Sequence, residues 1–459
     1  LGDYVQSCAG VCTGDYPRFG RSFWEILSFS DKWSPQQTTN DRVGMSSGYS
    51  KALLWEGNDG SLRQYVTEKL GASAVGSWIR GKDAWGKAGV AVTLMQDLPT
   101  AHYYGELFDD NIAVLIPRKP SDLAAIRAFC SSSEFANEVR KFNQKLAVKT
   151  QYLVKVPFDI NKWRLEANEG IPAVPRDPTQ WLFTGRPKES ELPFQVAVAR
   201  LAGYTWPRQS GHSFPLHPAL PPDQIRAHAD DDGIVCLTAL KGEPPAEQRL
   251  NALLADAFGI EWSAAKLAGL LVDAGYAGKS LDDWLRDGFF EQHCALFQQR
   301  PFIWHIWDGR RDGFHALINY HRLAAPNGEG RRTLEKLIYS YLGDWIDRQR
   351  ADQNAGVEGA DARLAHAEHL KAELIKILEG EPPYDIFVRW KPLREQPVGW
   401  DPDIDDGVRM NIRPFMTARP LAARGANTSI LRTTPKIKWD KDRGKEPNRD
   451  KTDYPWFWG

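Results

Sequence analysis

Two arginines and two phenylalanines near the start of the chain have the side-chain chemistry to bind an anion or a flat ring. They lie in residues 10–25, GVCTGDYPRFGRSFWE, as Arg18, Phe19, Arg21 and Phe23. The Gly-Asp and Tyr-Pro steps in this stretch favour a loop over a long helix. A loop that exposes guanidinium groups beside aromatic rings suits phosphate contact, because one arginine can donate several hydrogen bonds to one phosphate.

A second group of basic and aromatic residues follows the opening stretch. Basic and aromatic side chains interleaved on loops suit phosphate contact combined with contact to bases. The chain also has 18 tryptophans, and a tryptophan-rich core with solvated lysines would produce the same sequence pattern. Both interpretations stay open for this group, which consists of Trp33, Lys51, Trp55, Trp78, Arg80, Lys82, Trp85 and Lys87.

The end of the chain is locally basic. Residues 409–451 contain twelve Lys or Arg against four Asp or Glu. Each phosphate that such a segment neutralises releases a counterion, so the composition predicts salt-dependent contact with DNA. A basic end that only improves solubility is the alternative. The predicted DNA contacts here are Lys436, Lys438, Lys441 and Arg443.

The stretch DAGYAGKS, residues 273–280, imitates a phosphate-binding loop. That loop needs a glycine where Asp273 stands, and a strand before it, whereas the preceding residues have a helical pattern. A carboxylate at this position would repel the phosphate. We therefore interpret Gly278 as a helix terminator, and Ser280 with Asp283 as the capping box of the next helix.

The stretch EPPYDIF, residues 381–387, imitates the Asn/Asp-Pro-Pro-Tyr/Phe loop with which amino-methyltransferases orient a target amine. Glu381 stands where Asn or Asp belongs, and no glycine-rich cofactor turn precedes it. A helix that ends at Gly380, followed by a strand over residues 384–390, explains the same letters.

Four histidines lie in and around one strand-pair pattern: His293, His305, His315 and His321. A general-base or metal-ligand role would need an acid or a nucleophile at motif spacing. Since none is present, packing roles are favoured. A hydrolase that uses the two central histidines with Asp308 and Asp312 is kept as an alternative.

The composition is that of a soluble globular protein with room for several cores. Of the 459 residues, 42% are apolar and 25% are charged, and the net charge is −1. A charge this close to zero gives no chain-wide attraction to nucleic acid, so any such attraction is local. No run of apolar residues is long enough for a membrane span, and no membrane partner is expected.

The five cysteines are odd in number and mostly scattered, as in proteins that keep their thiols reduced in the cytoplasm. Cys8 and Cys12 are close in sequence, but no second Cys or His pair lies nearby to complete a tetrahedral zinc site. We therefore expect a cytoplasmic protein without a bound metal.

Helix and strand patterns alternate along the chain and predict an α+β fold. Residues 1–167 predict a mixed α/β module, with a hairpin at 51–65, a strand at 85–95, one helix over 121–142 and a strand at 151–158. The next three parts are a linker with short helices, a helical segment with a β-hairpin at 300–321, and a helical hairpin with a strand. They cover residues 168–245, 246–330 and 331–399, and a basic irregular tail covers 400–459.

Several longer strings point to a known family. Residues 10–25 are followed in order by AWGKAGVAVTLM, GELFDDNIAVLIP, LAAIRAFCSSSEF and LVKVPFD, and later by EQHCALFQQRPFIWHIWDGRRDGFHALINYHRL, GEPPYDIFVRWKPL and IKWDKDRGKE. Together they resemble adenine-specific DNA methyltransferases of type IIG restriction–modification and of BREX- or DISARM-like phage-defence systems. In that family the first string has the form G-x-x-T-G-(D/N)-x-x-R-F-x-R and opens the target-recognition domain.

The resemblance implies the recognition and C-terminal part of a DNA N6-adenine methyltransferase, with double-stranded DNA as its partner. The family's S-adenosylmethionine turn and its (N/D)-P-P-(Y/F) loop do not occur in these residues. The expectation is therefore a catalytic domain before Leu1 that binds the cofactor, a chain that continues past Gly459, and neither catalytic nor cofactor-binding residues here. The implied DNA contacts are Thr13, Arg18 and Arg21, with Lys51, Trp55, Trp85 and Lys87 next.

An alternative from another class remains. The chain would then be a non-catalytic scaffold or interaction subunit of a defence complex, which docks onto other subunits through the helical hairpin at residues 331–379. Such a subunit would not read a DNA sequence.

Overall fold

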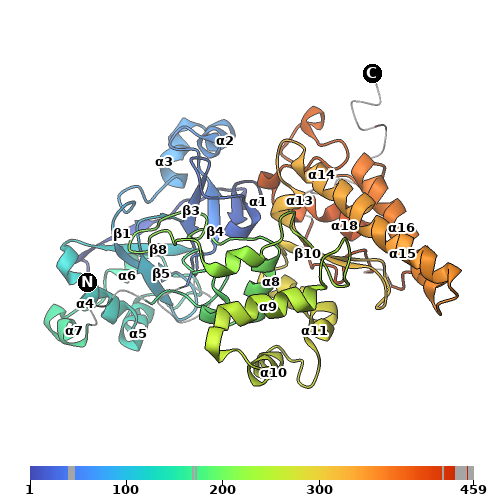
Figure 1. The fold of residues 1–459 in the computed structure, drawn as a ribbon. Coiled ribbons are helices and arrows are strands. Elements are labelled where there is room, and N and C mark those ends of the chain that lie inside the picture. The colour runs from blue at the N-terminus through green and yellow to red at the C-terminus, as the bar shows by residue number, and fades with distance from the viewer. Residues whose placement is uncertain (40–46, 168–169, 171–172, 426–427, 440–451, 453–459) are drawn as a thin grey trace. The chain divides into compact units, whose positions relative to one another are not determined.

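The structure is a computed structural model that describes residues 1–39, 47–167, 170, 173–425, 428–439 and 452 (Figure 1). Helices make up 42% and strands 13% of the chain, in several small sheets, so the predicted α+β class is confirmed. No helix in the described ranges is both long enough and apolar enough to cross a bilayer.

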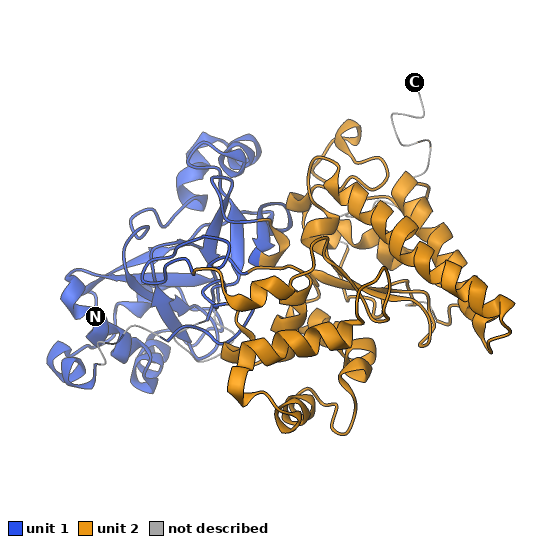
Figure 2. Ribbon diagram, in the orientation of Figure 1, with its two compact units in different colours: residues 1–23, 28–184, 206–220 blue, residues 24–27, 185–205, 221–459 orange. Residues whose placement is uncertain are grey.

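The chain divides into two compact units (Figure 2). Unit 1 comprises residues 1–23, 28–184 and 206–220, and unit 2 comprises residues 24–27, 185–205 and 221–459. Each unit is therefore built from segments that are not continuous in sequence, and each is described on its own below.

The first sheet of unit 1 is antiparallel throughout and has the order β1 (Val5–Ala9), β8 (Ile112–Pro117), β5 (Gly89–Thr93), β6 (Thr100–Tyr103). β-branched residues such as Val90 and Val92 face an apolar core that also contains Phe129 and Phe135. Phe129 lies on α4 (Leu123–Cys130) and Phe135 on α5 (Ser133–Phe142). Two more short helices, α6 (Thr150–Leu153) and α7 (Ile160–Glu166), contribute to the same core. The predicted strand within residues 85–95 is confirmed as β5.

The second sheet of unit 1 has the order β2 (Gly20–Ser22), β4 (Lys51–Leu54), β3 (Trp33–Gln37), β7 (Leu107–Phe108). It pairs antiparallel except between β3 and β7, which are parallel. The short helices α1 (Tyr16–Phe19), α2 (Ser61–Leu70) and α3 (Val75–Trp78) precede or follow its strands. Phe19, Leu53, Leu62 and Val66 form one apolar cluster, which ties α1 and α2 to this sheet.

Unit 2 contains a three-stranded antiparallel sheet in the order β10 (Ile303–Trp307), β11 (His315–Asn319), β9 (Ile234–Cys236). The first two strands form the predicted hairpin of residues 300–321. At its tip the Asp308 carboxylate accepts hydrogen bonds from the backbone N–H groups of Arg310 and Phe314, each 2.9 Å long. This bonding closes the turn without needing a residue outside the hairpin.

The other elements of unit 2 are mainly helices: α8 (Pro193–Leu201), α9 (Ala246–Phe258), α10 (Ala264–Asp273), α11 (Leu281–Asp287), α12 (Phe289–Leu296), α13 (Tyr320–Leu323), α14 (Glu329–Glu335), α15 (Leu342–Asn354), α16 (Ala360–Glu379), α17 (Val408–Asn411) and α18 (Arg413–Thr417). A π-helical turn, Lys336–Tyr341, joins α14 to α15. The long helices α15 and α16 lie side by side as the predicted helical hairpin (Figure 1). Gly359 and Gly380 cap α16 with φ of 77° and 75°, values that favour glycine.

Two predicted elements of unit 1 were wrong for local reasons. The hairpin at residues 51–65 is instead β4 followed by α2, because the Glu56 carboxylate accepts the Ser61 backbone N–H at 3.0 Å and starts a helix. The single helix over residues 121–142 is broken into α4 and α5, since the Ser132 hydroxyl caps the second helix by accepting from the Phe135 N–H.

Two predicted strands are also absent from their positions. Residues 151–158 contain most of α6 and an irregular stretch. The Val154 carbonyl accepts from the Gly2 backbone N–H, and the Val156 carbonyl accepts from the N-terminal ammonium group of Leu1. Residues 384–390 form no strand, because the Gln396 side-chain amide bonds both the N–H and the C=O of Val388 at 2.8 and 2.7 Å. A side chain there takes the place of a neighbouring strand.

Candidate nucleic-acid interface

Arg18 lies half-buried at the end of α1 with its guanidinium group over two aromatic rings. Its Cζ atom is 5.0 Å from the ring centroid of Phe19 and 5.1 Å from that of Tyr65. Stacking on rings holds a guanidinium plane in place while leaving its N–H edge available to an acceptor. Among the residues that the structure describes, no carboxylate forms an ion pair with it.

Arg21, on β2, occupies a different environment. Its side chain is 4% exposed, and Nη1 donates to the backbone carbonyls of Pro17 and Gly20 at 2.8 and 2.7 Å. Its Cζ atom also lies 5.5 Å from the Trp33 ring centroid. These contacts fasten the turn of α1 to the sheet, so Arg21 stabilises the opening stretch from within. Thr13 is buried as well, and of these three residues Arg18 presents the most accessible guanidinium or hydroxyl.

In the second predicted group, Trp55 and Trp85 contact each other, whereas Lys51 and Lys87 lie on or beside different strands. Trp55 and Trp85 meet edge to face with ring centroids 5.3 Å apart, and both pack against the cluster that contains Leu53. This is the arrangement expected of a tryptophan-rich core. Lys51 is half-buried on β4 and donates from Nζ to the Ser22 hydroxyl at 3.1 Å. Lys87 is exposed just before β5.

The predicted contacts in the tail are only partly described. Lys436 and Lys438 are both exposed, and the backbone N–H of Lys436 donates to the Gln299 side chain at 2.9 Å. Lys441 and Arg443 lie outside the described residues. Their relation to the other two lysines therefore stays a prediction.

A stretch of unit 1 outside the predicted contacts also has an unbalanced positive charge. Between residues 139 and 158, which we call the basic segment, there are five cationic residues and no Asp or Glu. They are Arg140, Lys141, Lys145, Lys149 and Lys155. The signal is present in the sequence as a run of cations without acids, which overlaps the helix predicted over residues 121–142 and the strand predicted over 151–158.

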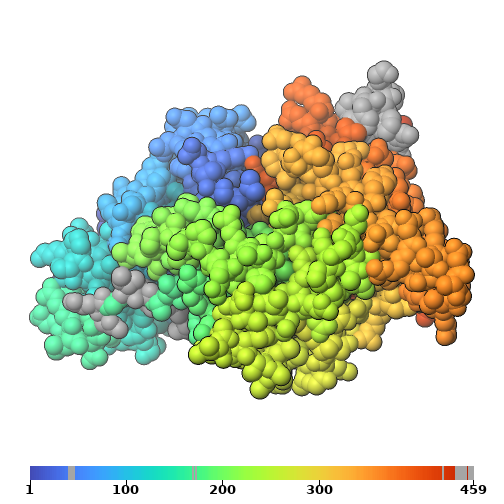
Figure 3. Space-filling view, in the orientation of Figure 1, coloured from blue at the N-terminus to red at the C-terminus, as the bar shows by residue number. Residues whose placement is uncertain are grey.

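The lysines of the basic segment point their charge to solvent. Lys145 and Lys149 are exposed and form no ion pair within the described part of the chain. Lys141 pairs with Glu138 one turn earlier on α5, and Lys155 lies over the Tyr152 ring at 5.3 Å. The surface of this part of the chain is visible in teal at the left of Figure 3.

The loop that carries Lys145 is firmly held. The Arg140 guanidinium donates to the carbonyls of Lys145 and Gln96, so it spans two segments of unit 1. The Asn143 side chain accepts the Lys145 N–H at 2.9 Å, and the Val148 N–H donates to Leu94 O at 2.8 Å. A loop fixed at several backbone positions loses less conformational entropy when it binds a partner.

Two large apolar side chains accompany these cations. Phe142 is 50% exposed at the end of α5, and Leu146 is 69% exposed at the tip of the loop. Exposed apolar side chains between cations are a feature of surfaces that contact both the phosphates and the sugars or bases of DNA.

The two histidines of the unit 2 hairpin, His305 and His315, are buried and bond to each other and to the backbone. His305 Nε2 is 2.9 Å from His315 Nδ1, and His315 Nε2 is 2.8 Å from the Arg310 carbonyl. Burial lowers the pKa of His315 to about 3 and that of His305 well below its usual value. Both imidazoles are therefore neutral and enclosed, which fits packing better than general-base catalysis.

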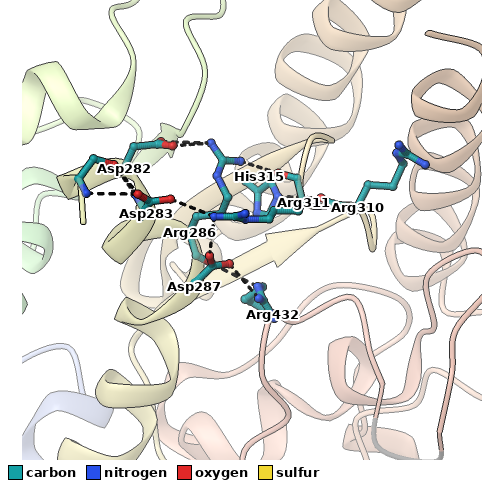
Figure 4. A network of polar contacts seen from close by, with 9 residues as sticks. Asp282, Asp283, Arg286, Asp287, Arg310, Arg311, His315 and Arg432 are labelled. Carbon is teal, nitrogen blue, oxygen red and sulfur yellow. Dashed lines mark hydrogen bonds and ion pairs between the residues drawn. The ribbon is translucent and has the colours of Figure 1, made fainter. Parts of the chain in front are cut away.

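Ion pairs surround the same hairpin and balance one another (Figure 4). Arg311 bonds Asp283 and Asp287 at 2.9 and 3.1 Å, and Arg432 shares Asp287 at 3.1 Å. Arg286 pairs with Asp282 at 2.9 Å and donates to the Arg311 carbonyl at 2.8 Å. Because each guanidinium already faces a carboxylate, this cluster of arginines offers little net charge to an anion.

The two enzyme-like motifs have structural roles. Ser280 and Asp283 form the predicted capping box of α11, which accounts for the end of the phosphate-loop-like string. The Tyr384 hydroxyl bonds the Glu373 carboxylate and the ring is buried, so it cannot stack on a base. Across the described ranges, no group of three or more His, Cys, Asp or Glu is arranged to hold a metal ion.

No protein-family model matches the chain, and no curated protein sequence matches it either.

Proposed function

We propose that this chain binds duplex DNA and that the basic segment of unit 1 makes the principal phosphate contacts. The observation that carries the proposal is the exposure of Lys145 and Lys149 in a stretch of twenty residues that contains no acid. A protein with a net charge of −1 needs such a local concentration of positive charge to attract a polyanion.

Arg18 is the second element of the proposed interface. Its guanidinium is stacked on two rings and faces no carboxylate in the part of the chain that is described. A preoriented guanidinium suits either a phosphate or the O6 and N7 atoms of guanine. Arg21 supports this element by bonding the carbonyl of Pro17, which precedes Arg18.

The biological role of this DNA binding is proposed from the resemblance of residues 10–25 to the motif that opens the family's target-recognition domain. We infer the recognition part of a site-specific DNA N6-adenine methyltransferase of a restriction–modification or phage-defence system, located in the cytoplasm. Methyl transfer and S-adenosylmethionine binding belong in this proposal to a domain outside these 459 residues. The residues present do not fit that chemistry, since Glu381 stands where the methyltransferase loop has Asn or Asp, and Tyr384 is buried against Glu373.

The DNA-binding proposal is tested by fluorescence anisotropy of a labelled duplex over a salt series. The variant Lys145→Ala/Lys149→Ala removes two exposed cations, and Lys241→Ala/Lys279→Ala removes two exposed lysines of unit 2 as the matched control. Since each neutralised phosphate contributes roughly 0.9 to the slope of log K against log salt, the first variant should lower the slope by about two. The control variant should leave the slope unchanged.

Equal slopes in both variants would refute the basic segment as the phosphate-binding surface. Absence of saturable binding by the unmodified chain at low salt would favour the scaffold alternative instead. The methyltransferase part is tested separately by the reading frame before Leu1, which should encode a glycine-rich cofactor turn and an N-P-P-Y-like loop. A frame without them removes that part and leaves the DNA-binding proposal intact.

A further inference from the structure

Unit 2 contains a cavity of about 380 Å³ between the start of α8 and the helices α10, α11 and α12. This volume lies within the range of about 300–1,000 Å³ that is usual for small-molecule sites. The inner wall is formed by the side chains of Phe194, Leu270, Trp284 and Leu296. The first three are buried, and the ring centroids of Phe194 and Trp284 are 4.9 Å apart.

The polar side chains in the wall are already satisfied by the protein. Gln195 donates to the Phe289 carbonyl at 3.3 Å and faces His293 Nδ1 at 3.1 Å. Gln292 accepts from the Trp284 indole N–H at 3.0 Å and donates to the Ala274 carbonyl at 2.8 Å. The interior therefore offers an apolar surface with few hydrogen bonds left for a ligand.

The mouth of the cavity carries charge of one sign. Two of the lining residues are charged, Glu191 and Asp273, and both are exposed carboxylates. The Asp273 side chain forms no hydrogen bond or ion pair with any residue in the described ranges. It is also the last residue of α10, where the helix dipole adds negative potential.

We propose that this cavity binds a small ligand with an apolar, ring-sized body and one ammonium group. The body would lie between Phe194, Trp284 and Leu296, and the ammonium group would face Asp273 at the end of α10. Aromatic walls favour this class twice, since they bury the apolar body and attract a cation near their faces. A carboxylate-bearing ligand would meet the like charge of Asp273 at the mouth.

The test uses three probes that share one apolar body: 2-phenylethylammonium, the neutral 2-phenylethanol and the anionic 3-phenylpropionate. Ligand-observed NMR titration of the whole chain should give the tightest binding for the ammonium and the weakest for the carboxylate. A hydrogen bond to a charged partner at a partly solvated mouth corresponds to about a ten-fold preference over the neutral probe.

Three variants then assign the site. Asp273→Asn should abolish the preference for the ammonium while leaving binding of the alcohol unchanged. Glu291→Gln removes an exposed carboxylate of the neighbouring α12 that does not line the cavity, and should change nothing. Ala295→Trp fills the cavity from its edge and should abolish binding of all three probes.

The proposal is overturned if the unmodified chain shows no preference for the ammonium, or if that preference survives Asp273→Asn. It is also overturned if the probes bind equally well to the Ala295→Trp variant. Asp273 is exposed, so its substitution should leave the melting temperature unchanged, and this measurement separates loss of the site from loss of the fold. None of these outcomes depends on DNA binding.

Discussion

The guanidinium group of Arg140 donates hydrogen bonds to the backbone carbonyl of Lys145 and to that of Gln96, so one side chain fixes the loop that presents the lysine. Arg140 thereby contributes to the basic segment mainly by holding its shape. The same side chain carries positive charge, and a test must separate the two contributions.

Replacing Arg140 by lysine keeps the charge but loses the double contact. We expect Arg140→Lys to lower the free energy of unfolding of unit 1 by about 1 kcal/mol, because one or two partly exposed hydrogen bonds are lost. DNA affinity should fall several-fold while the salt slope stays the same, since the number of phosphate contacts is unchanged. Thermal melting and anisotropy measure the two effects, and an unaltered affinity would show that loop shape does not matter.

A comparison of Arg18 with Arg21 separates a side chain that contacts DNA from one that stabilises the fold. Arg18→Ala should weaken DNA binding with little change in melting temperature, because its guanidinium is half-exposed and stacked on rings. Arg21→Ala should lower the free energy of unfolding by about 2–3 kcal/mol, since it leaves buried carbonyls without donors. If Arg21→Ala melted like the unmodified chain and lost DNA affinity directly, the supporting role assigned here would be wrong.

His293 makes the stability of unit 2 sensitive to acid. Its Nε2 atom accepts from the N–H groups of Phe302 and Ile303, and burial lowers its pKa to about 3. Because the folded pKa lies below the ordinary value near 6.5, the stabilisation is fully present above pH 6.5 and is lost as pH falls toward 3. The loss is about 1.4 kcal/mol per pH unit within that window.

Melting temperatures between pH 7 and pH 4 test this dependence, with His293→Gln as the variant that cannot titrate. The unmodified chain should lose stability more steeply than the variant as the pH falls. His228→Gln is the control, since His228 is a half-buried residue paired with the exposed Asp256. Parallel pH profiles for the unmodified chain and His293→Gln would contradict the assignment.

Gly380 and Gly356 test the two costs of replacing a glycine. Both have positive φ, 75° and 70°, but a Cβ on Gly380 would approach the Gly399 nitrogen to 2.4 Å, whereas one on Gly356 meets open space. Gly356→Ala should lower the free energy of unfolding by about 1 kcal/mol through backbone strain alone. Gly380→Ala should cost clearly more, and equal losses in chemical denaturation would contradict the close approach.

The sequence predicted the elements whose signals are local. The hairpin of residues 300–321 and the helical hairpin have strong periodicity and glycine-rich turns, and both are present. The Ser280 capping box was recognisable for the same reason, because all its atoms lie within one turn.

Elements that depend on side-chain contacts from outside their own segment were not predictable in this way. The apolar alternation of residues 384–390 is typical of a strand, yet the Gln396 side chain takes the backbone bonds that a neighbouring strand would supply. Arg21 has the residue type and spacing of a surface contact, and only the packing of β2 against Trp33 shows that it is buried. The run of cations in the basic segment can be recognised in the sequence, but its exposure depends on how α5 and the loop after it are held.

The absence of acids between residues 139 and 158 has a consequence for how fast a polyanion is captured. The whole chain carries a net charge of −1, so the negative charge that compensates this stretch resides elsewhere in the sequence. Such a separation of charge gives the molecule a permanent electric dipole, which turns it before contact is made. Association kinetics, and not only the final equilibrium, should therefore slow as added ions shorten the range of that orienting force.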